Sequence, residues 1–147
     1  MEARAATDAD VPTLLEMIRD FFSWESISLD LARIEPALRT LLANADLGNV
    51  WVFEADQETI GYAIVTFGFD LEFNGRDAFL TDFYLKSAWR DRGLGRHALE
   101  LVFHRARSSG VHALHLLVDP KNQRAVRVYE RTGFEQSHRV AMTKMLL

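Results

Sequence analysis

The sequence predicts a mixed α/β fold, an α/β or α+β sandwich built around a mixed sheet. Its 147 residues are 48% hydrophobic and 26% charged, a composition typical of a globular protein. Two helical patterns come first, a hairpin follows, and helices and strands then alternate to the last residue. No repeat and no Pro/Gly-rich linker interrupts this order, so residues 1–147 are expected to form a single domain.

The first third of the chain contains the expected pair of helices. A short strand over residues 2–6 precedes Thr7 and Asp8, either of which is a typical N-cap, and an amphipathic helix then runs to about Phe22. A second helix is expected over about 29–43, interrupted or begun near Pro36. Residues 50–55 then form a strand that ends in a turn.

The clearest local pattern is a hairpin between residues 60–73 and 76–86. Both runs are rich in β-forming residues, and the Asn74-Gly75 pair between them is preferred in two-residue turns. With ideal pairing from that turn, Asp82 would lie opposite Phe67. A β-bulge in the second strand would turn Asp82 to the other face.

The second half alternates helices and strands. Residues 93–108 form an amphipathic helical pattern, and residues 113–118 form a short buried strand. A helix is expected over 122–131, with Gly133 beyond its end, and a final strand over 139–147.

Composition and charge narrow the classes of function. The chain has no cysteine, which removes disulfides and thiolate chemistry, and no apolar run reaches the ~20 residues of a membrane span. No signal-peptide pattern opens the chain, so a cytoplasmic setting is expected. Residues 1–75 hold 14 acids and 4 bases, whereas residues 76–147 hold 7 acids and 13 bases. This asymmetry suits an anionic ligand on the second half, or it reflects uneven solvated faces. Nucleic acid is not expected as a partner, because the basic residues form no dense run.

The strongest sign of a ligand lies in residues 89–96, between a strand and a helix. Gly93 and Gly95 let the backbone turn tightly and approach a ligand, and the following helix directs its free N–H groups to the same point. Arg90, Arg92 and Arg96 add positive charge. The combination predicts a pyrophosphate site.

Two nucleotide-binding motifs compete for this loop. A P-loop is excluded because no Lys-Ser or Lys-Thr follows Gly95. A dinucleotide fingerprint fits Gly93, Gly95 and Ala98, with Asp119 as the ribose-binding acid. However, seven residues separate the strand from Gly93, and only 28 residues follow Asp119, too few for the further βαβ units of that fold.

The loop also matches a known family. Arg90-x-x-Gly93-x-Gly95 resembles the acyl-CoA pyrophosphate motif of the GNAT acetyltransferase superfamily, and Asn122-x-x-Ala125-x-x-x-Tyr129-Glu130-x-x-Gly133-Phe134 resembles its second motif. Residues 4–12 are similar to its first strand and helix start, so the resemblance covers essentially the whole chain. It implies a mixed, mostly antiparallel sheet of six to seven strands, four flanking helices, and a splay between the fourth and fifth strands.

The resemblance further implies acetyl-CoA as co-substrate. The pyrophosphate would bind backbone N–H groups of the loop, and the pantetheine arm would pair with the preceding strand inside the splay. Asn122 would contact the arm from the other side, although a helix N-cap also explains this residue. The expected cofactor-binding residues are Phe83, Tyr84, Leu85, Arg90, Asp91, Arg92, Gly93, Leu94, Gly95, Arg96, Asn122, Ala125 and Tyr129.

Three residues are candidates for catalysis. The position of Tyr129 matches the general acid of the superfamily, which protonates the leaving thiolate, although a packed core tyrosine is the alternative. Asp82 is the candidate base because a carboxyl inside an apolar strand has a raised pKa, but a structural carboxylate explains it equally well. Glu72, which ideal pairing places opposite Asp77, is a second candidate for holding the amine.

The expected reaction is direct transfer of an acetyl group from acetyl-CoA to a primary amine. The acidic first half favours a small cationic acceptor such as a polyamine, an amino acid or an aminoglycoside. Acetylation of a protein or peptide amino group stays open, as does non-catalytic binding of acyl-CoA. The spacing of the histidines argues against a metal site, and pairing through the final strand would give a homodimer.

Overall fold

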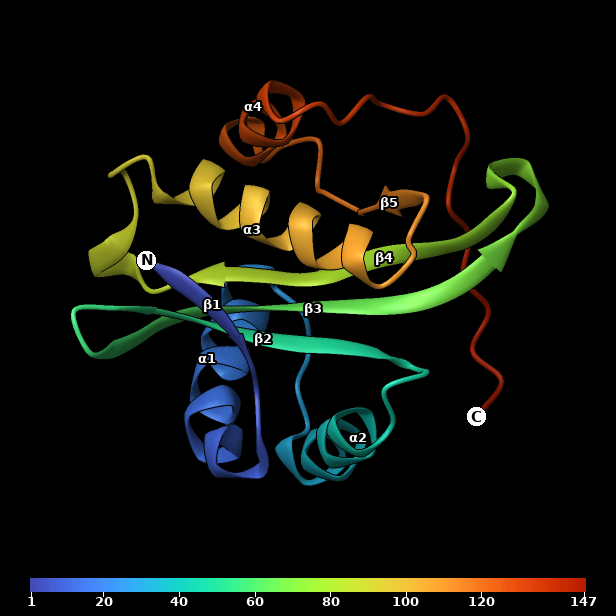
Figure 1. The fold of residues 1–147 in the computed structure, drawn as a ribbon. Helices are drawn as coiled ribbons and strands as arrows, with labels where there is room; N and C mark the ends of the chain where they lie inside the picture. The colour runs from blue at the N-terminus through green and yellow to red at the C-terminus, as the bar shows by residue number, and fades with distance from the viewer. The chain divides into compact units, whose positions relative to one another are not determined.

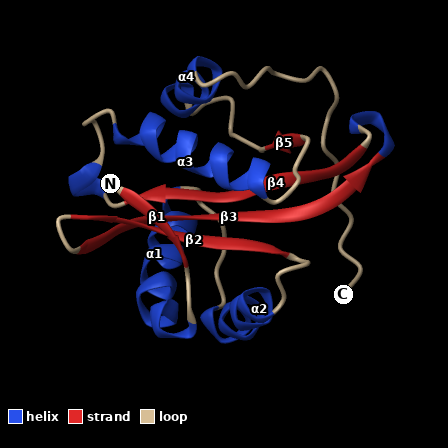
Figure 2. Ribbon diagram, in the orientation of Figure 1, coloured by secondary structure: helices blue, strands red, loops and turns tan.

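The computed structural model describes residues 1–147 and centres on a five-stranded sheet, drawn in red in Figure 2. Its strands are β1 (Glu2–Ala5), β2 (Gly48–Ala55), β3 (Glu58–Asp70), β4 (Gly75–Leu85) and β5 (Ala113–His115), in the spatial order β1-β2-β3-β4-β5. Strands β1 to β4 pair antiparallel, and β5 pairs parallel to β4. The predicted mixed, mostly antiparallel sheet is therefore confirmed.

Four helices accompany the sheet, as predicted: α1 (Val11–Trp24), α2 (Leu31–Ala43), α3 (Leu94–Ser108) and α4 (Gln123–Arg131). The chain forms two compact units, Met1–Leu117 (the first unit) and Val118–Leu147 (the second unit), and only α4 belongs to the second. Within the first unit, α1 and α2 cover one face of the sheet and α3 covers the other (Figure 1). Helix α2 begins at Leu31, where the Asp30 side chain accepts the backbone N–H of Ala32, and it is continuous through Pro36.

The core between the sheet and α1 and α2 is built from alternate strand residues and one stripe of each helix. On β2 and β3, every second side chain points to these helices, as the period of a strand requires. The buried members are Val11, Leu14, Met17, Ile18, Leu38, Val50, Val52, Tyr62, Ile64 and Tyr84.

Two strand predictions are wrong. Residues 139–147 form no strand, and their apolar side chains are exposed, Val140 by 85% and Met142 by 93%. A run of β-forming residues needs a neighbouring strand to receive its backbone hydrogen bonds, and this segment has none. The sheet accordingly has five strands instead of six to seven. Strand β5 is also shorter than the predicted 113–118, because it pairs with β4 only over 113–115.

The predicted hairpin forms, but its turn is longer than two residues. Strand β3 ends at Asp70, which pairs with Gly75, and a single 3-10 turn over Leu71–Phe73 lies between them. The Asp70 carboxylate accepts the backbone N–H of Glu72, and Asn74 adopts the left-handed conformation at φ 60°. Glu72 therefore does not face Asp77, which pairs with Gly68, so the expected Glu72–Asp77 pairing is wrong.

A charged cluster ties β1 to the start of α1 and to β2. The Arg4 guanidinium donates two hydrogen bonds of 2.8 Å to the Asp10 carboxylate and one of 2.8 Å to Glu54. Asp10 also accepts the backbone N–H of Thr7. Hydrogen bonds from Arg4 hold the pKa of Asp10 at about 2.

Replacing Asp10 with asparagine is expected to lower the free energy of unfolding by about 1–2 kcal/mol at neutral pH. A depressed carboxyl pKa stabilises the fold above the unfolded value of about 3.9, and this contribution is lost as pH falls toward 2. The difference between parent and variant should therefore shrink over that range, as measured by urea unfolding. Asp8→Asn, which alters an 83% exposed carboxylate on the same turn, is the matched control. An equal loss in both variants would contradict this role.

Candidate active site

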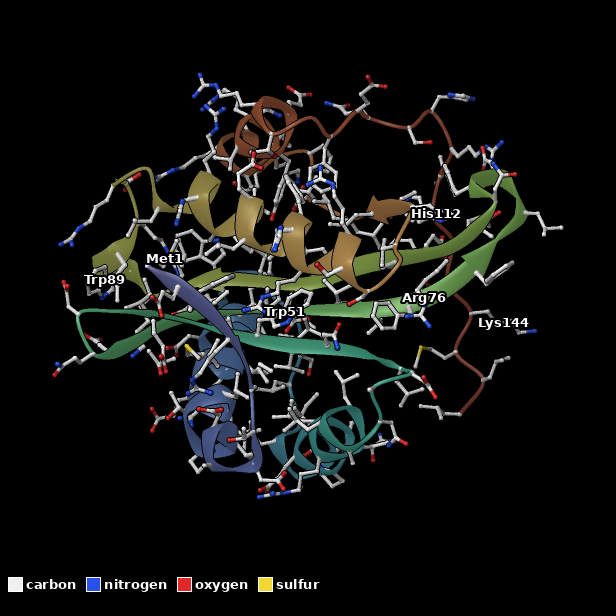
Figure 3. The ribbon with its side chains drawn as sticks, viewed as in Figure 1. Met1, Trp51, Arg76, Trp89, His112 and Lys144 are labelled. Carbon is white, nitrogen blue, oxygen red and sulfur yellow. The ribbon has the colours of Figure 1, made fainter.

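The loop between β4 and α3 ends at the start of a helix, where backbone N–H groups are free of intrahelical partners. A 3-10 turn over Ser87–Trp89 leads from β4 to this loop, and Trp89 lies at the opposite end of β4 from Arg76 (Figure 3). Asp91 at φ 62° and Gly93 at φ 74° are both left-handed, and Gly93 is the N-cap of α3. The first N–H groups of a helix have no partner inside it, and the helix dipole favours an anion there. The loop can therefore accept an anionic ligand.

Gly95 supports a ligand at this loop more directly. Apart from its chain neighbours and the helix's own backbone, a Cβ atom added at Gly93 or Gly95 would meet no protein atom within 4 Å. A glycine inside a helix costs about 0.5–1 kcal/mol relative to alanine, and no neighbouring group of the chain requires Gly95. The open space beside the backbone is the space that a closely bound pyrophosphate would fill. This loop thus fits the diphosphate of acetyl-CoA.

The three arginines of the loop differ in what they contact. The Arg90 Nε donates to the carbonyl of Leu85 at 2.7 Å, and its guanidinium stacks on Trp24 at 4.5 Å and Tyr84 at 5.2 Å. Arg90 therefore joins the end of β4 to α1. Arg92 stacks on Trp89 at 5.0 Å, and Arg96 is exposed on the first turn of α3.

Strands β4 and β5 separate shortly before the loop. The two strands pair over three positions, ending with Phe79 opposite His115, and β4 then continues to Leu85 with β3 as its only partner. Pairing between the fourth and fifth strands therefore stops where a splay is predicted, because β5 itself ends at His115. Backbone groups of residues 80–85 on that side have no neighbouring strand. The predicted arm-binding residues Phe83, Tyr84 and Leu85 all lie in this stretch.

A β-bulge sets the direction of Asp82. Ile64 pairs with Asp82 while Val65 pairs with Leu80, so Thr81 is an extra residue in β4. Because Ile64 faces α1 and α2, Asp82 faces them too. The predicted pairing of Asp82 with Phe67 is therefore wrong. The β-bulge, which was the alternative, is present instead.

Asp82 is a buried carboxyl with a specific partner. Its side chain is 8% exposed and accepts a hydrogen bond from the Tyr62 hydroxyl at 2.7 Å. Burial raises the pKa of Asp82, while the hydrogen bonds from Tyr62 and Thr81 oppose that rise. Burial also raises the pKa of Tyr62, so the phenol is the proton donor of the pair. The arrangement provides a carboxylate that is more basic than an exposed one.

Glu72, the other predicted acid, does not lie beside Asp82. Glu72 is exposed in the turn between β3 and β4. Asp77 instead meets His115, whose Nε2 lies 3.1 Å from the carboxylate, with the rings of Phe73 and Phe79 at 5.0 and 5.1 Å. Sequence reasoning missed this pair because it depends on the register of β5, which no local pattern specifies.

The second unit carries the remaining predicted site residues. The Asn122 side chain accepts the backbone N–H of Ala125 at 3.2 Å, so it caps α4. The Tyr129 ring meets Phe134 edge-on at 5.7 Å, and Gly133 ends the helix at φ 102°. Contacts of Asn122, Ala125 and Tyr129 with a ligand stay predictions.

Two further findings concern the whole chain. None of its helices combines the length and the apolar character that crossing a membrane requires. No three histidine, aspartate or glutamate side chains lie together in a group that could hold a metal ion.

Known proteins resemble the chain over most of its length. The model of the Acetyltransferase (GNAT) family matches residues 11–134. A thialysine N-epsilon-acetyltransferase of Bos taurus is 26% identical over 88% of this chain and 81% of its own length. An uncharacterized N-acetyltransferase of Bacillus subtilis, YycN, is 39% identical over 71 residues, which are 48% of this chain and 45% of that protein.

Solved structures share the fold. An integron cassette protein from the mobile metagenome of Cole Harbour Salt Marsh matches with a TM-score of 0.86 and 32% identity, covering 99% of this chain and 90% of that chain. A protein of Clostridium acetobutylicum named as a predicted acetyltransferase, solved with acetyl-CoA, matches with a TM-score of 0.81 and 20% identity, covering 99% of this chain and 96% of that chain.

Proposed function

Because the chain belongs to the GNAT acetyltransferase family and is an acetyl-CoA-dependent N-acetyltransferase, we propose that it acetylates the primary amine of a small molecule by direct attack. The observation that carries this proposal is the stretch of β4 that continues beyond its pairing with β5 and leads into the open loop at Gly93 and Gly95. The relative from Bos taurus is named for acetylation of an amino group of a small molecule, thialysine.

The proposed site places acetyl-CoA along β4 and the following loop. Backbone N–H groups of residues 91–96 bind the pyrophosphate, with Arg92 and Arg96 adding charge. Residues 83–85 pair with the amides of the pantetheine arm. The likeness of the Asn122–Phe134 segment to the second motif of the family supports Asn122 and Ala125 as further contacts of the arm. Arg90 acts on the loop through its bond to Leu85, which fixes the end of β4. Acetyl-CoA supplies the thioester that the amine attacks.

In the proposed reaction, two protein groups move protons. The Asp82 carboxylate takes a proton from the bound ammonium, because an amine attacks only in its neutral form. Tyr62 holds the carboxylate in place by its hydroxyl. Tyr129 gives a proton to the CoA thiolate as it leaves. Glu72, exposed in the turn between β3 and β4, remains a candidate for attracting a cationic amine to the molecule.

The first test is calorimetric titration of the full chain with acetyl-CoA, with NAD as the control ligand. Micromolar binding of acetyl-CoA alone is the expected result. Binding of NAD instead would overturn the proposal, because the loop would then be a dinucleotide site. An acetyl transfer assay that follows release of the CoA thiol then tests the reaction with a panel of small amines.

Replacing Asp82 with asparagine is expected to lower kcat at least 10²-fold and to remove the acidic limb of the pH profile. That limb should lie above the ordinary aspartate pKa of about 3.9, because burial raises the pKa of Asp82. A raised pKa also means that ionisation of Asp82 destabilises the fold as pH rises through that value. The variant should therefore melt at a higher temperature than the parent at pH 7, and the gain should vanish near pH 4.

The matched control is Asp77→Asn, which neutralises the other buried carboxylate of β4. We expect this variant to keep the acidic limb and most of kcat. A parental pH profile in Asp82→Asn would contradict the role of Asp82 as base. An Asp82→Asn variant that loses stability at neutral pH would contradict the burial argument.

A further inference from the structure

Arg90, which lies directly before the loop at residues 91–96, is held by groups outside that loop. Its guanidinium carbon lies 4.5 Å from the centre of the Trp24 ring and 5.2 Å from the centre of the Tyr84 ring. Its Nε donates to the Leu85 carbonyl at 2.7 Å. Tyr84 and Leu85 end β4, whereas Trp24 is the last residue of α1. One side chain therefore joins the end of α1, the end of β4 and the start of the loop.

Trp24 contributes little to the core of the first unit. Its side chain is 65% exposed, and the last buried residue of α1 is Ile18. A ring that stays largely in water adds little hydrophobic stabilisation, because that stabilisation grows with the apolar area removed from water. A cation–π contact with an arginine, in contrast, is favourable at exposed sites as well. The contact with Arg90 is therefore the main interaction that this exposed ring provides.

Backbone hydrogen bonds fix the end of α1 where Trp24 lies. The backbone N–H of Ile27 donates to the Phe22 carbonyl at 2.8 Å. The N–H of Ser26, which is left-handed at φ 55°, donates to the Ser23 carbonyl at 3.2 Å. These two bonds form a Schellman motif, which ends a helix with a defined geometry. The Trp24 ring is thus presented to Arg90 from a hydrogen-bonded helix end.

A carboxylate on the same helix complements the charge of the arginine. Asp20 lies four residues before Trp24, so the two side chains emerge on one side of α1. Burial and then the charge of Asp20 raise the pKa of Tyr84, whereas the charge of Arg90 opposes this rise. Asp20 and Arg90 therefore act on the same phenol with opposite signs. Helix α1 thus offers the arginine an aromatic ring and a negative charge.

The loop needs an anchor because its backbone turns left-handed directly after Arg90. Asp91 is a non-glycine residue at φ 62°, and Gly93 follows at φ 74°. A non-glycine residue stays in this region only where the surrounding structure holds it there. Arg90 is bound to both α1 and β4 and immediately precedes Asp91. The contacts of Arg90 therefore set where the loop and its N–H groups begin.

We infer that Trp24 is a positioning residue for acetyl-CoA: by holding Arg90, it keeps the loop at residues 91–96 in the conformation that binds the pyrophosphate, without touching the cofactor. The inference rests on the proposed placement of the pyrophosphate on this loop, and it adds a residue of α1. A ligand that binds one loop conformation has an apparent affinity proportional to the population of that conformation. Loss of the Trp24 ring should therefore weaken acetyl-CoA binding and leave the chemical step unchanged.

Replacing Trp24 with alanine tests the inference. A cation–π contact changes an equilibrium constant by a factor of about 2 to 30, so we expect the Kd of acetyl-CoA to rise about 5-fold or more. The KM for acetyl-CoA should rise with it, while kcat at saturating acetyl-CoA stays within about 2-fold of the parent. Trp24→Phe, which keeps an aromatic ring, should restore most of the affinity. Calorimetric titration and steady-state rates measure these quantities.

Ile27→Ala is the matched control, because Ile27 is another large apolar side chain at this end of α1 and is 50% exposed. Its Kd for acetyl-CoA should equal that of the parent. Both alanine variants should melt close to the parental temperature, since both side chains are largely exposed. An equal loss of affinity in Trp24→Ala and Ile27→Ala would overturn the inference, because any change at this helix end would then disturb the site.

A double-mutant cycle tests whether Trp24 acts through Arg90. Arg90→Met removes the guanidinium and keeps an apolar stem, so it should weaken acetyl-CoA binding by itself. In that background, Trp24→Ala should change the Kd by less than about 2-fold, because the effects of residues in contact are not additive. Full additivity of the two losses would overturn the inference, since Trp24 would then act on the cofactor by a route that does not pass through Arg90.

The parent protein distinguishes this inference from the proposed function. If the parent binds acetyl-CoA and Trp24→Ala binds it equally well, the inference is wrong and the proposed function stands. If the parent does not bind acetyl-CoA, both are wrong.

Discussion

Replacing Gly95 with aspartate is expected to weaken acetyl-CoA binding roughly 100-fold or more without destabilising the fold. A carboxylate beside a bound pyrophosphate costs about 3 kcal/mol at the effective dielectric constant of a protein surface. The same carboxylate favours the helix, because Gly95 is the second residue of α3 and acids stabilise helix N-termini. Calorimetric titration and thermal melting together measure these opposite effects.

Gly95→Ala separates charge from space at this position. Alanine should stabilise α3 by about 0.5–1 kcal/mol, because no protein atom lies within 4 Å of the added Cβ. Its effect on acetyl-CoA binding should be smaller than that of aspartate, since it adds bulk without charge. Parental affinity in Gly95→Asp would show that the pyrophosphate does not rest on the start of α3.

Replacing Tyr129 with phenylalanine is expected to lower kcat by about 10²–10³-fold, because the thiolate must then leave without its proton donor. The Kd of acetyl-CoA should stay within a few-fold of the parental value. The ring is retained, so its edge-on contact with Phe134 and the melting temperature should be preserved. Steady-state rates and calorimetric titration measure the two quantities.

The control for this variant is Phe134→Leu, which loosens the packing around Tyr129 and leaves its hydroxyl in place. We expect a lower melting temperature and a modest loss of kcat. A loss of kcat in Phe134→Leu as large as that in Tyr129→Phe would indicate that packing, not the hydroxyl, explains the effect. Unchanged turnover in Tyr129→Phe would exclude the residue as general acid.

Local patterns predicted the elements that depend on nearby residues. The helices, the hairpin and the loop before α3 follow from apolar periodicity, glycine placement and capping, all of which act over a few residues. Gly93 was expected at a tight turn and is left-handed at φ 74°. The Asn122 side chain was expected at a helix start and caps α4. Such features need no knowledge of distant neighbours.

Features that depend on pairing between distant segments could not be predicted in the same way. The direction of Asp82 follows from the bulge at Thr81, which a two-residue turn at Asn74-Gly75 does not anticipate. The last nine residues have the composition of a strand but pair with no other strand. The open pocket beside Asp82 is lined by residues of α1, α2, β3 and β4, so no single stretch of sequence contains it.

The extra residue in β4, Thr81, reverses which face of the sheet each following side chain points to. Before Thr81, side chains alternate in one phase, and after it they alternate in the opposite phase. A deletion of one residue here would exchange the two sides for everything downstream, moving Asp82 beneath α3 and bringing Phe83 toward α1 and α2. The number of residues in β4 therefore determines which side chains face α1 and α2, as much as the identity of those residues does. Homologues that differ by one residue in this strand would present different groups to the same acceptor.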